Sequence, residues 1–127
     1  MKYKCNLYDV SINTNAGADF FIVLGDFLDE FYRSDPFTRS MMLQDMPVDM
    51  PKPEMLPFLA ATAHRLANVY KLNAPQWVFN SCCYLPGPEP FFGCGAMGKL
   101  RLLFMYKSPP EFKHRNLFVD ENVLLRV

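Results

Sequence analysis

The clearest helical pattern in this chain is Pro53-Glu54-Met55-Leu56-Pro57-Phe58-Leu59-Ala60-Ala61-Thr62-Ala63-His64-Arg65-Leu66-Ala67-Asn68-Val69-Tyr70-Lys71. Apolar residues recur in it every three or four positions, the spacing of one face of an α-helix. They are Leu56, Leu59, Ala60, Ala63, Leu66, Ala67 and Tyr70. The small alanines would allow a neighbouring helix to approach closely. We therefore predict an amphipathic helix over residues 53–71.

Two helical segments precede this one. Over residues 17–33 apolar side chains recur at helical spacing, with charged side chains on the other side. Ser34-Asp35-Pro36 then supplies a cap residue and a proline at the first position of a short helix, which we expect to stop before Pro47. The prolines of residues 46–53 restrict the chain to extended conformations, so this segment is a connector.

The N-terminal residues have no helical pattern that continues into these segments. Tyr3, Cys5 and Leu7 alternate with polar residues, as in a short edge strand, but a single strand here has no evident partner. We therefore expect an N-terminal arm over residues 1–14 and a single helical domain over residues 15–127.

Residues 75–107 are harder to assign. Pro75 restarts a short helical turn, and the prolines of residues 85–90 force an irregular path that Phe91-Phe92 would anchor. Between residues 95 and 107 the apolar positions fit a helix, but their alternation fits a strand equally well. Periodicity leaves the choice open, and we favour a buried helix.

The last segment begins with Ser108-Pro109-Pro110-Glu111, which matches a capping box at the start of a short helix. Asn116 can end that helix, and Leu117-Phe118-Val119 is typical of an extended segment. Asp120 can then cap a final turn.

Length and composition favour one globular domain. The chain has 127 residues, of which 50% are apolar and 20% charged. Its thirteen basic and thirteen acidic residues cancel, which argues against a strong field for nucleic acid or anionic membranes. It contains no apolar run of the roughly 18 residues that span a membrane and no secretory signal, so we expect a cytoplasmic protein. The predicted fold is all-α with room for minor β structure: a compact bundle of about five to six short, proline-bounded helices.

Cysteine and histidine residues provide the nearest approach to reactive chemistry. Cys82, Cys83 and Cys94 with His114 are the only group that resembles a zinc site, but adjacent cysteines chelate one ion poorly and the paired spacing of zinc motifs is missing. A cysteine nucleophile would need a base, and His64 and His114 both lie in polar helical settings. We expect reduced, buried thiols, no metal and no catalysis.

Two other patterns have simple structural explanations. Asp26 and Glu30 lie one helical turn apart, but ion-pair spacing to Arg33 marks a solvated helix face. Residues 93–98 have the glycine spacing of a dinucleotide loop, but neither a preceding strand nor a βαβ unit is evident from the sequence. We therefore expect no cofactor.

A cluster of methionines and an aromatic loop are the candidate contacts with a partner protein. Methionine surfaces adapt to different partners, although gap-filling in the core is the alternative explanation for these residues. The candidates are Met42, Met46, Met50, Trp77, Tyr84, Phe91 and Phe92.

A basic segment gives a second hypothesis, contact with nucleic acid. Its candidates are Lys107, Lys113, His114 and Arg115, with Phe112 and Phe118 as stacking faces. Cations also collect at the end of a helix because of its dipole, which is the structural alternative.

Several segments together resemble a family of small, uncharacterised bacterial helical proteins. They are residues 24–32 with Phe-Leu-Asp-Glu-Phe-Tyr, residues 75–78 with Pro-Gln-Trp-Val, and residues 108–119 with Ser-Pro-Pro-Glu-Phe and Arg-Asn-Leu-Phe-Val. The resemblance spans residues 20–127. It implies a bacterial origin and an occurrence alone or beside helix-turn-helix segments and toxin–antitoxin-type genes, and it assigns no catalytic residue.

These observations favour a non-catalytic module that binds another protein, in the manner of an antitoxin or a regulatory subunit. The alternative is a nucleic-acid accessory protein that uses residues 107–115. A cysteine- or zinc-dependent enzyme ranks third.

Overall fold

The computed structural model describes residues 6–126. The helices of this part are α1 (Leu7–Asn15), α2 (Phe20–Arg33), α3 (Pro36–Gln44), α4 (Met55–Val69), α5 (Lys99–Lys107) and α6 (Pro110–Lys113). Short 3-10 turns are η1 (Gln76–Phe79), η2 (Ser81–Cys83) and η3 (Gly93–Gly95), and two strands are β1 (Phe91–Phe92) and β2 (Leu117–Phe118). The predicted all-α fold with minor β structure is therefore confirmed.

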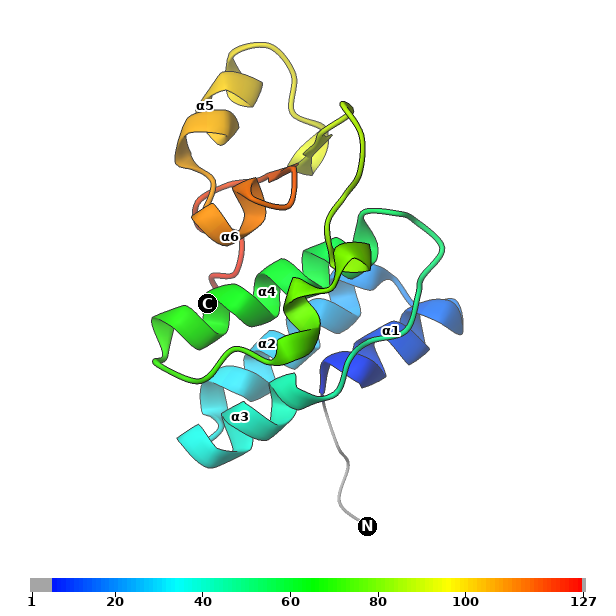
Figure 1. The fold of residues 1–127 in the computed structure, drawn as a ribbon, viewed down its shortest axis with the longest axis vertical. Coiled ribbons are helices and arrows are strands. Elements are labelled where there is room, and N and C mark those ends of the chain that lie inside the picture. Colours follow the sequence, from blue (N-terminus) through cyan, green and yellow to red (C-terminus); the bar gives the residue numbers. More distant parts are fainter. Residues whose placement is uncertain (1–5, 127) are drawn as a thin grey trace.

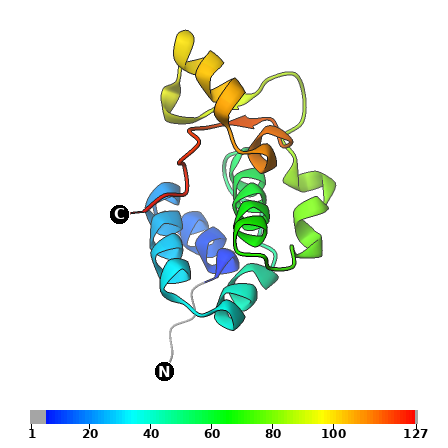
Figure 2. The same ribbon diagram turned by 90° about the vertical axis from the view of Figure 1, so that its left-hand side faces the viewer.

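The helices α1 to α4 form one end of the molecule, and α5 with the two strands forms the other (Figure 1). The short helix α6 lies between these two parts, next to α4 (Figure 1). After β2 the chain runs back to α2, where the Tyr32 hydroxyl donates a hydrogen bond of 2.7 Å to the carbonyl oxygen of Leu124 (Figure 2). The C-terminal segment therefore connects the two ends.

The helix α1 stands where we expected an arm, so that prediction is wrong for residues 7–14. Asn6 caps α1 reciprocally with Asp9, since each backbone N–H donates to the other's side chain. Leu7 and Val10 lie on the buried side of this helix, which packs against α2. The strand-like alternation of Tyr3 and Cys5 lies outside the described residues.

The helix α3 begins where the sequence predicts, and α2 begins at Phe20, three residues after its predicted start. Asp19 accepts hydrogen bonds from the backbone of Phe21 and Ile22, and Asp35 accepts one from Thr38, with Pro36 in the first turn of α3. The face of α2 that enters the core consists of Phe20, Leu24, Gly25, Phe27, Leu28 and Phe31.

The helix α4 is the centre of the core, as its pattern predicts. Its buried residues run almost without interruption from Leu56 to Ala67. The Phe58 ring meets Phe20 and Phe112 edge-on, with ring centroids 5.8 and 5.2 Å apart. This one side chain therefore joins α2, α4 and α6.

The two strands pair in parallel, with Phe91 opposite Leu117 and Phe92 opposite Phe118. Because α5 and α6 lie between them in the chain, the region is a very short βαβ crossover. We expected no strand before residues 93–98 and no βαβ unit around them, and both expectations are wrong. The Arg101 side chain lies against β1 and the segment that follows it. Its guanidinium donates to the carbonyl oxygen of Ala96 and stacks over the Phe92 ring.

Residues 99–107 form the helix α5, as we favoured, but the expectation that this helix would be buried is wrong. Phe104 is its only buried residue, with 4% of its surface exposed. The apolar spacing of this segment fitted a strand as well as a helix, and its burial depends on whether a second element covers it. In the described chain no element covers its outer face (Figure 1).

The predicted capping box at residues 108–111 does not form. The Ser108 Oγ instead lies within hydrogen-bond distance of the carbonyl oxygens of Phe104 and Val119, which share its one proton, and accepts from the backbone N–H of Val119. This buried serine fastens the end of α5 to the segment after β2. The helix α6 ends at Lys113, three residues before the predicted Asn116, whose positive φ lies in the turn that follows. Asp120 accepts from the backbone of Asn122 in a final turn, as predicted.

No helix among residues 6–126 has both the length and the apolar character needed to cross a bilayer.

Candidate functional site

A groove with a volume of about 630 Å³ lies between α1, α2 and α3. Val10, Val23, Met41 and Met42 supply apolar surface to it. The polar residues that line it are Asn6, Asp9, Asn13, Asp26, Asp29, Glu30, Arg33, Ser34 and Thr38. Four of these are carboxylates and one is a cation, so the groove is acidic.

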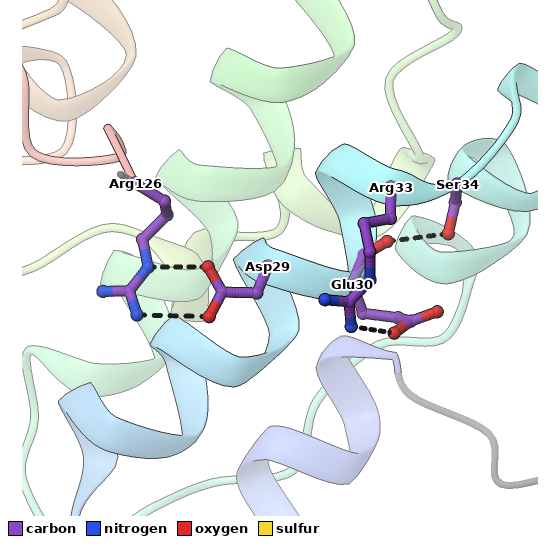
Figure 3. Close-up of polar contacts among 5 residues, drawn as sticks. All are labelled: Asp29, Glu30, Arg33, Ser34 and Arg126. Atoms are coloured by element: carbon purple, nitrogen blue, oxygen red, sulfur yellow. Dashed lines mark hydrogen bonds and ion pairs between the residues drawn. The ribbon is translucent and has the colours of Figure 1, made fainter.

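Two of the four carboxylates are already paired on the surface of α2 (Figure 3). Glu30 Oε1 lies 2.7 Å from Arg33 Nη2, and Ser34 Oγ donates to the Glu30 carbonyl oxygen at 2.8 Å. Asp29 accepts from Arg126 Nε at 3.0 Å and from Nη2 at 3.3 Å, and this hydrogen bonding holds the pKa of Asp29 below its ordinary value. Both pairs are exposed, so water and salt screen them and they remain able to exchange partners.

The other two carboxylates, Asp9 and Asp26, form no ion pair within the described residues. Asp9 uses one oxygen for the cap of α1. Asp26 is exposed, and among the described residues none donates a hydrogen bond to it or forms an ion pair with it. Carboxylates above an apolar, methionine-containing floor suit a ligand that carries both apolar and cationic groups.

The outer face of α5 is a second exposed surface at the opposite end of the molecule (Figure 1). Lys99, Leu102, Leu103 and Tyr106 follow the spacing i, i+3, i+4, i+7, so they lie in one row, which we call the α5 stripe. Leu102 is 65% exposed and Tyr106 79% exposed. The helix also carries Arg101 and Lys107 and no acidic residue, so this apolar row lies on a cationic element.

A buried polar cluster joins the two ends of the molecule. Arg115 is 1% exposed, and its guanidinium donates to the carbonyl oxygens of Glu111 at 2.9 Å and Val78 at 2.7 Å and stacks over Tyr84 at 4.6 Å. Burial lowers the pKa of Arg115 below its ordinary value, but a guanidinium stays charged at neutral pH.

The polar atoms of this cluster are incompletely paired. Glu111 Oε2 accepts from Asn68 at 2.7 Å, while Glu111 Oε1 has only Arg65 Nη1 at 3.6 Å, too far for a hydrogen bond. Arg115 Nε has no hydrogen-bond partner among the described residues either. The cluster lies within the fold, so we assign it a structural role.

Most of the predicted partner contacts are core residues. Met42, Met50 and Trp77 are buried, and Met46 is half-buried against the same core. Of the methionines near the connector, Met41 and Met42 line the groove. The core alternative therefore accounts for Met42, Met50 and Trp77, although Met42 also reaches the groove.

The predicted aromatic loop is occupied by contacts within the chain. Tyr84 lies under Arg115, and Phe91 and Phe92 form β1. Phe92 stacks on Phe118 with centroids 5.4 Å apart and receives the Arg101 guanidinium. These half-buried rings support the short sheet.

The predicted basic patch is dispersed in the structure. Arg115 is buried, so it is wrong as a nucleic-acid contact. Lys107 pairs with Glu121 at 3.5 Å, and Lys113 Nζ donates to the carbonyl oxygen of Tyr106 at 2.7 Å, while His114 is exposed. These side chains do not form one continuous surface.

Within the described residues no group of three or more His, Cys, Asp or Glu is arranged to hold a metal ion. Cys82 is exposed and Cys83 is buried, and the side chain of Cys94 lies outside the described part.

Sequence patterns did not identify Asp9 as a lining residue of the groove, or Leu102 and Tyr106 as exposed residues. The spacing of residues 99, 102, 103 and 106 was a visible signal for the α5 stripe, because apolar residues recur there at helical spacing next to a lysine. The groove had no such local signal, since three helices contribute to it.

No protein-family model, curated protein or solved structure matches this chain.

Proposed function

We propose that this protein is a protein-interaction module that acts by binding rather than by catalysis. The observation that carries the proposal is the α5 stripe. A helix that turns Leu102 and Tyr106 to solvent places apolar surface where folding of the chain gives it no cover. Exposed rows of this kind at i, i+3, i+4 and i+7 are used for docking into a groove of a binding partner.

The resemblance to small bacterial helical proteins supports a regulatory role in the manner of an antitoxin, in a bacterial cytoplasm. A binding subunit of this kind needs an accessible contact surface and no reactive group. The balanced charge of the chain agrees with a protein partner more readily than with a nucleic acid, which attracts strongly basic proteins.

Contact with nucleic acid is less well supported as an alternative. Within the segment 107–115, Arg115 is buried in the core, and Lys107 and Lys113 have partners within the chain. Binding to random DNA or RNA that weakens with salt and with Lys113→Gln would favour this alternative.

The test of the proposed function is co-purification from the native cell. We expect the tagged wild-type chain to retain one protein in stoichiometric amount, and the Leu102→Glu/Tyr106→Glu variant to lose it. The Leu125→Glu variant is the matched control, because Leu125 is 66% exposed and lies outside α5. Equal retention by all three chains would contradict the proposal.

A further inference from the structure

We propose that the α5 stripe of one molecule docks in the groove between α1, α2 and α3 of a second copy of this chain. The inference rests on the proposed function, because it identifies a partner for the same stripe. It joins two exposed surfaces that lie at opposite ends of the molecule.

Charge is the first argument for this pairing. The helix α5 carries no carboxylate, and among its cations Lys99 has no ion pair within the described residues, whereas Lys107 pairs with Glu121 and Arg101 stacks over Phe92. In the groove, Asp29 and Glu30 are paired with Arg126 and Arg33, which leaves the negative charges of Asp9 and Asp26. Complementary potentials of this kind select a partner and fix the direction of docking.

The charges also argue against the simplest symmetric dimer. If two α5 helices packed against each other, the cations of both would be brought together without an acidic residue from either helix. Like charges placed face to face disfavour such a contact. The groove offers the same apolar row a surface of opposite charge.

Shape and side-chain chemistry are the second argument. The nine residues of α5 extend about 14 Å at 1.5 Å per residue, and the anchors i, i+3, i+4 and i+7 present one face over that length. Met41 and Met42 in the groove can adapt to Leu102 and Leu103, because methionine side chains are flexible. Lys99 lies in the same row and can reach the carboxylates.

The position of the two surfaces makes the contact intermolecular. The helix α5 lies at one end of the molecule and α1 and α3 lie at the other (Figures 1 and 2). A molecule therefore cannot place α5 in its own groove. Each copy would use its stripe on one neighbour and its groove on another, a head-to-tail arrangement that gives chains or closed rings.

Two complementary variants test this arrangement. The stripe variant is Leu102→Glu/Tyr106→Glu, which turns new carboxylates toward the acidic groove. The groove variant is Asp26→Lys, at an exposed α2 position that makes no hydrogen bond or ion pair within the described residues. Circular dichroism first establishes that both variants keep the helical content of the wild type. If the stripe variant does not, Leu102→Ser replaces it, and if the groove variant does not, Asp26→Asn replaces it.

Sedimentation equilibrium then gives the association constants. We expect the wild type to self-associate with concentration and to do so less at high salt. Each variant alone should lose at least about tenfold in the association constant. An equimolar mixture should regain association as a 1:1 dimer, because one variant keeps an intact groove and the other an intact stripe. The control Leu125→Glu should associate like the wild type.

Two results would overturn the inference. One is a wild type that stays monomeric at every concentration. The other is a wild type that associates while the mixture of variants does not form the dimer, which would place the contact elsewhere. If the monomeric wild type still retains its native protein through the stripe, the proposed function stands and only the second copy as partner is wrong.

Discussion

Arg115 Nη2 donates a hydrogen bond of 2.7 Å to the carbonyl oxygen of Val78, 37 positions earlier in the chain. The same guanidinium donates to Glu111 and stacks on Tyr84. Through these contacts Arg115 fastens the segment that follows α6 to η1 and to the loop after η2. The buried cation is therefore a polar link between the two ends of the molecule.

We expect Arg115→Leu to lower the free energy of unfolding by about 3 to 5 kcal/mol, since it leaves the carbonyl groups of Val78 and Glu111 buried without their hydrogen-bond donor. Urea denaturation followed by circular dichroism gives the value. The matched control is Arg33→Leu, which breaks an exposed pair with Glu30 and should cost less than about 1 kcal/mol. Equal effects of the two substitutions would show that Arg115 is not the link we infer.

His64 makes stability depend on pH. Burial, and after it the Arg115 charge, lowers the pKa of His64 below its ordinary value of 6.5. Its Nδ1 lies 3.3 Å from Arg115 Nη1, where a neutral ring can accept a hydrogen bond. Because the unfolded chain takes up this proton at a higher pH than the folded protein, the contribution is complete above pH 6.5 and is lost as the pH falls below it.

The measurement for His64 is urea denaturation at pH 7.5 and pH 5.5, together with an NMR titration of both histidines. We expect the loss of stability on acidification to shrink in His64→Gln and to persist in His114→Gln. A His64 resonance that titrates above pH 6.5 would contradict the lowered pKa of this side chain.

The adjacent cysteines should react very differently. Burial, and after it the neighbouring Cys82, raises the pKa of Cys83 to about 12, so its thiol is protonated at neutral pH. The thiolate is the reactive form, so we expect iodoacetamide at pH 7.5 to modify exposed Cys82 and to leave Cys83 unmodified until the protein unfolds. Fragment mass spectra distinguish the two positions. Rapid native labelling of Cys83 in Cys82→Ser would refute the assignment.

Tyr32 secures the returning C-terminal segment. Burial, and after it the neighbouring Tyr70, raises the pKa of Tyr32 to about 12, and its hydroxyl donates to Leu124. Tyr32→Phe should cost about 0.5 to 1.5 kcal/mol of stability and speed amide exchange near Leu124. Tyr106→Phe is the control, since that ring is exposed, and it should change neither quantity.

The helices were predictable where local pattern and local energetics agree. α2, α3 and α4 combine a regular apolar spacing with recognisable starts such as Asp35-Pro36, and the structure places them accordingly. α1 was missed although Asn6 and Asp9 form a reciprocal cap, because only two apolar residues of this short helix, Leu7 and Val10, enter the core.

Other features depend on contacts that sequence pattern does not contain. Ser108 matches a capping residue locally, but its hydroxyl binds Val119, which only the folded chain brings near. The burial of Arg115 likewise depends on Val78 and Tyr84, which come from distant segments. The groove could not be predicted from spacing, because Asp9 and Asp26 belong to different helices.

The fluorescence of Trp77 reports on the folded state of this protein. Trp77 is the only tryptophan of the chain, and its buried indole Nε1 donates 3.0 Å to the carbonyl oxygen of Leu43 in α3. Its fluorescence emission should therefore move to longer wavelength when η1 separates from α3. Substitutions on α5 that abolish binding should leave the emission maximum unchanged, so a single spectrum distinguishes a lost contact from a lost fold.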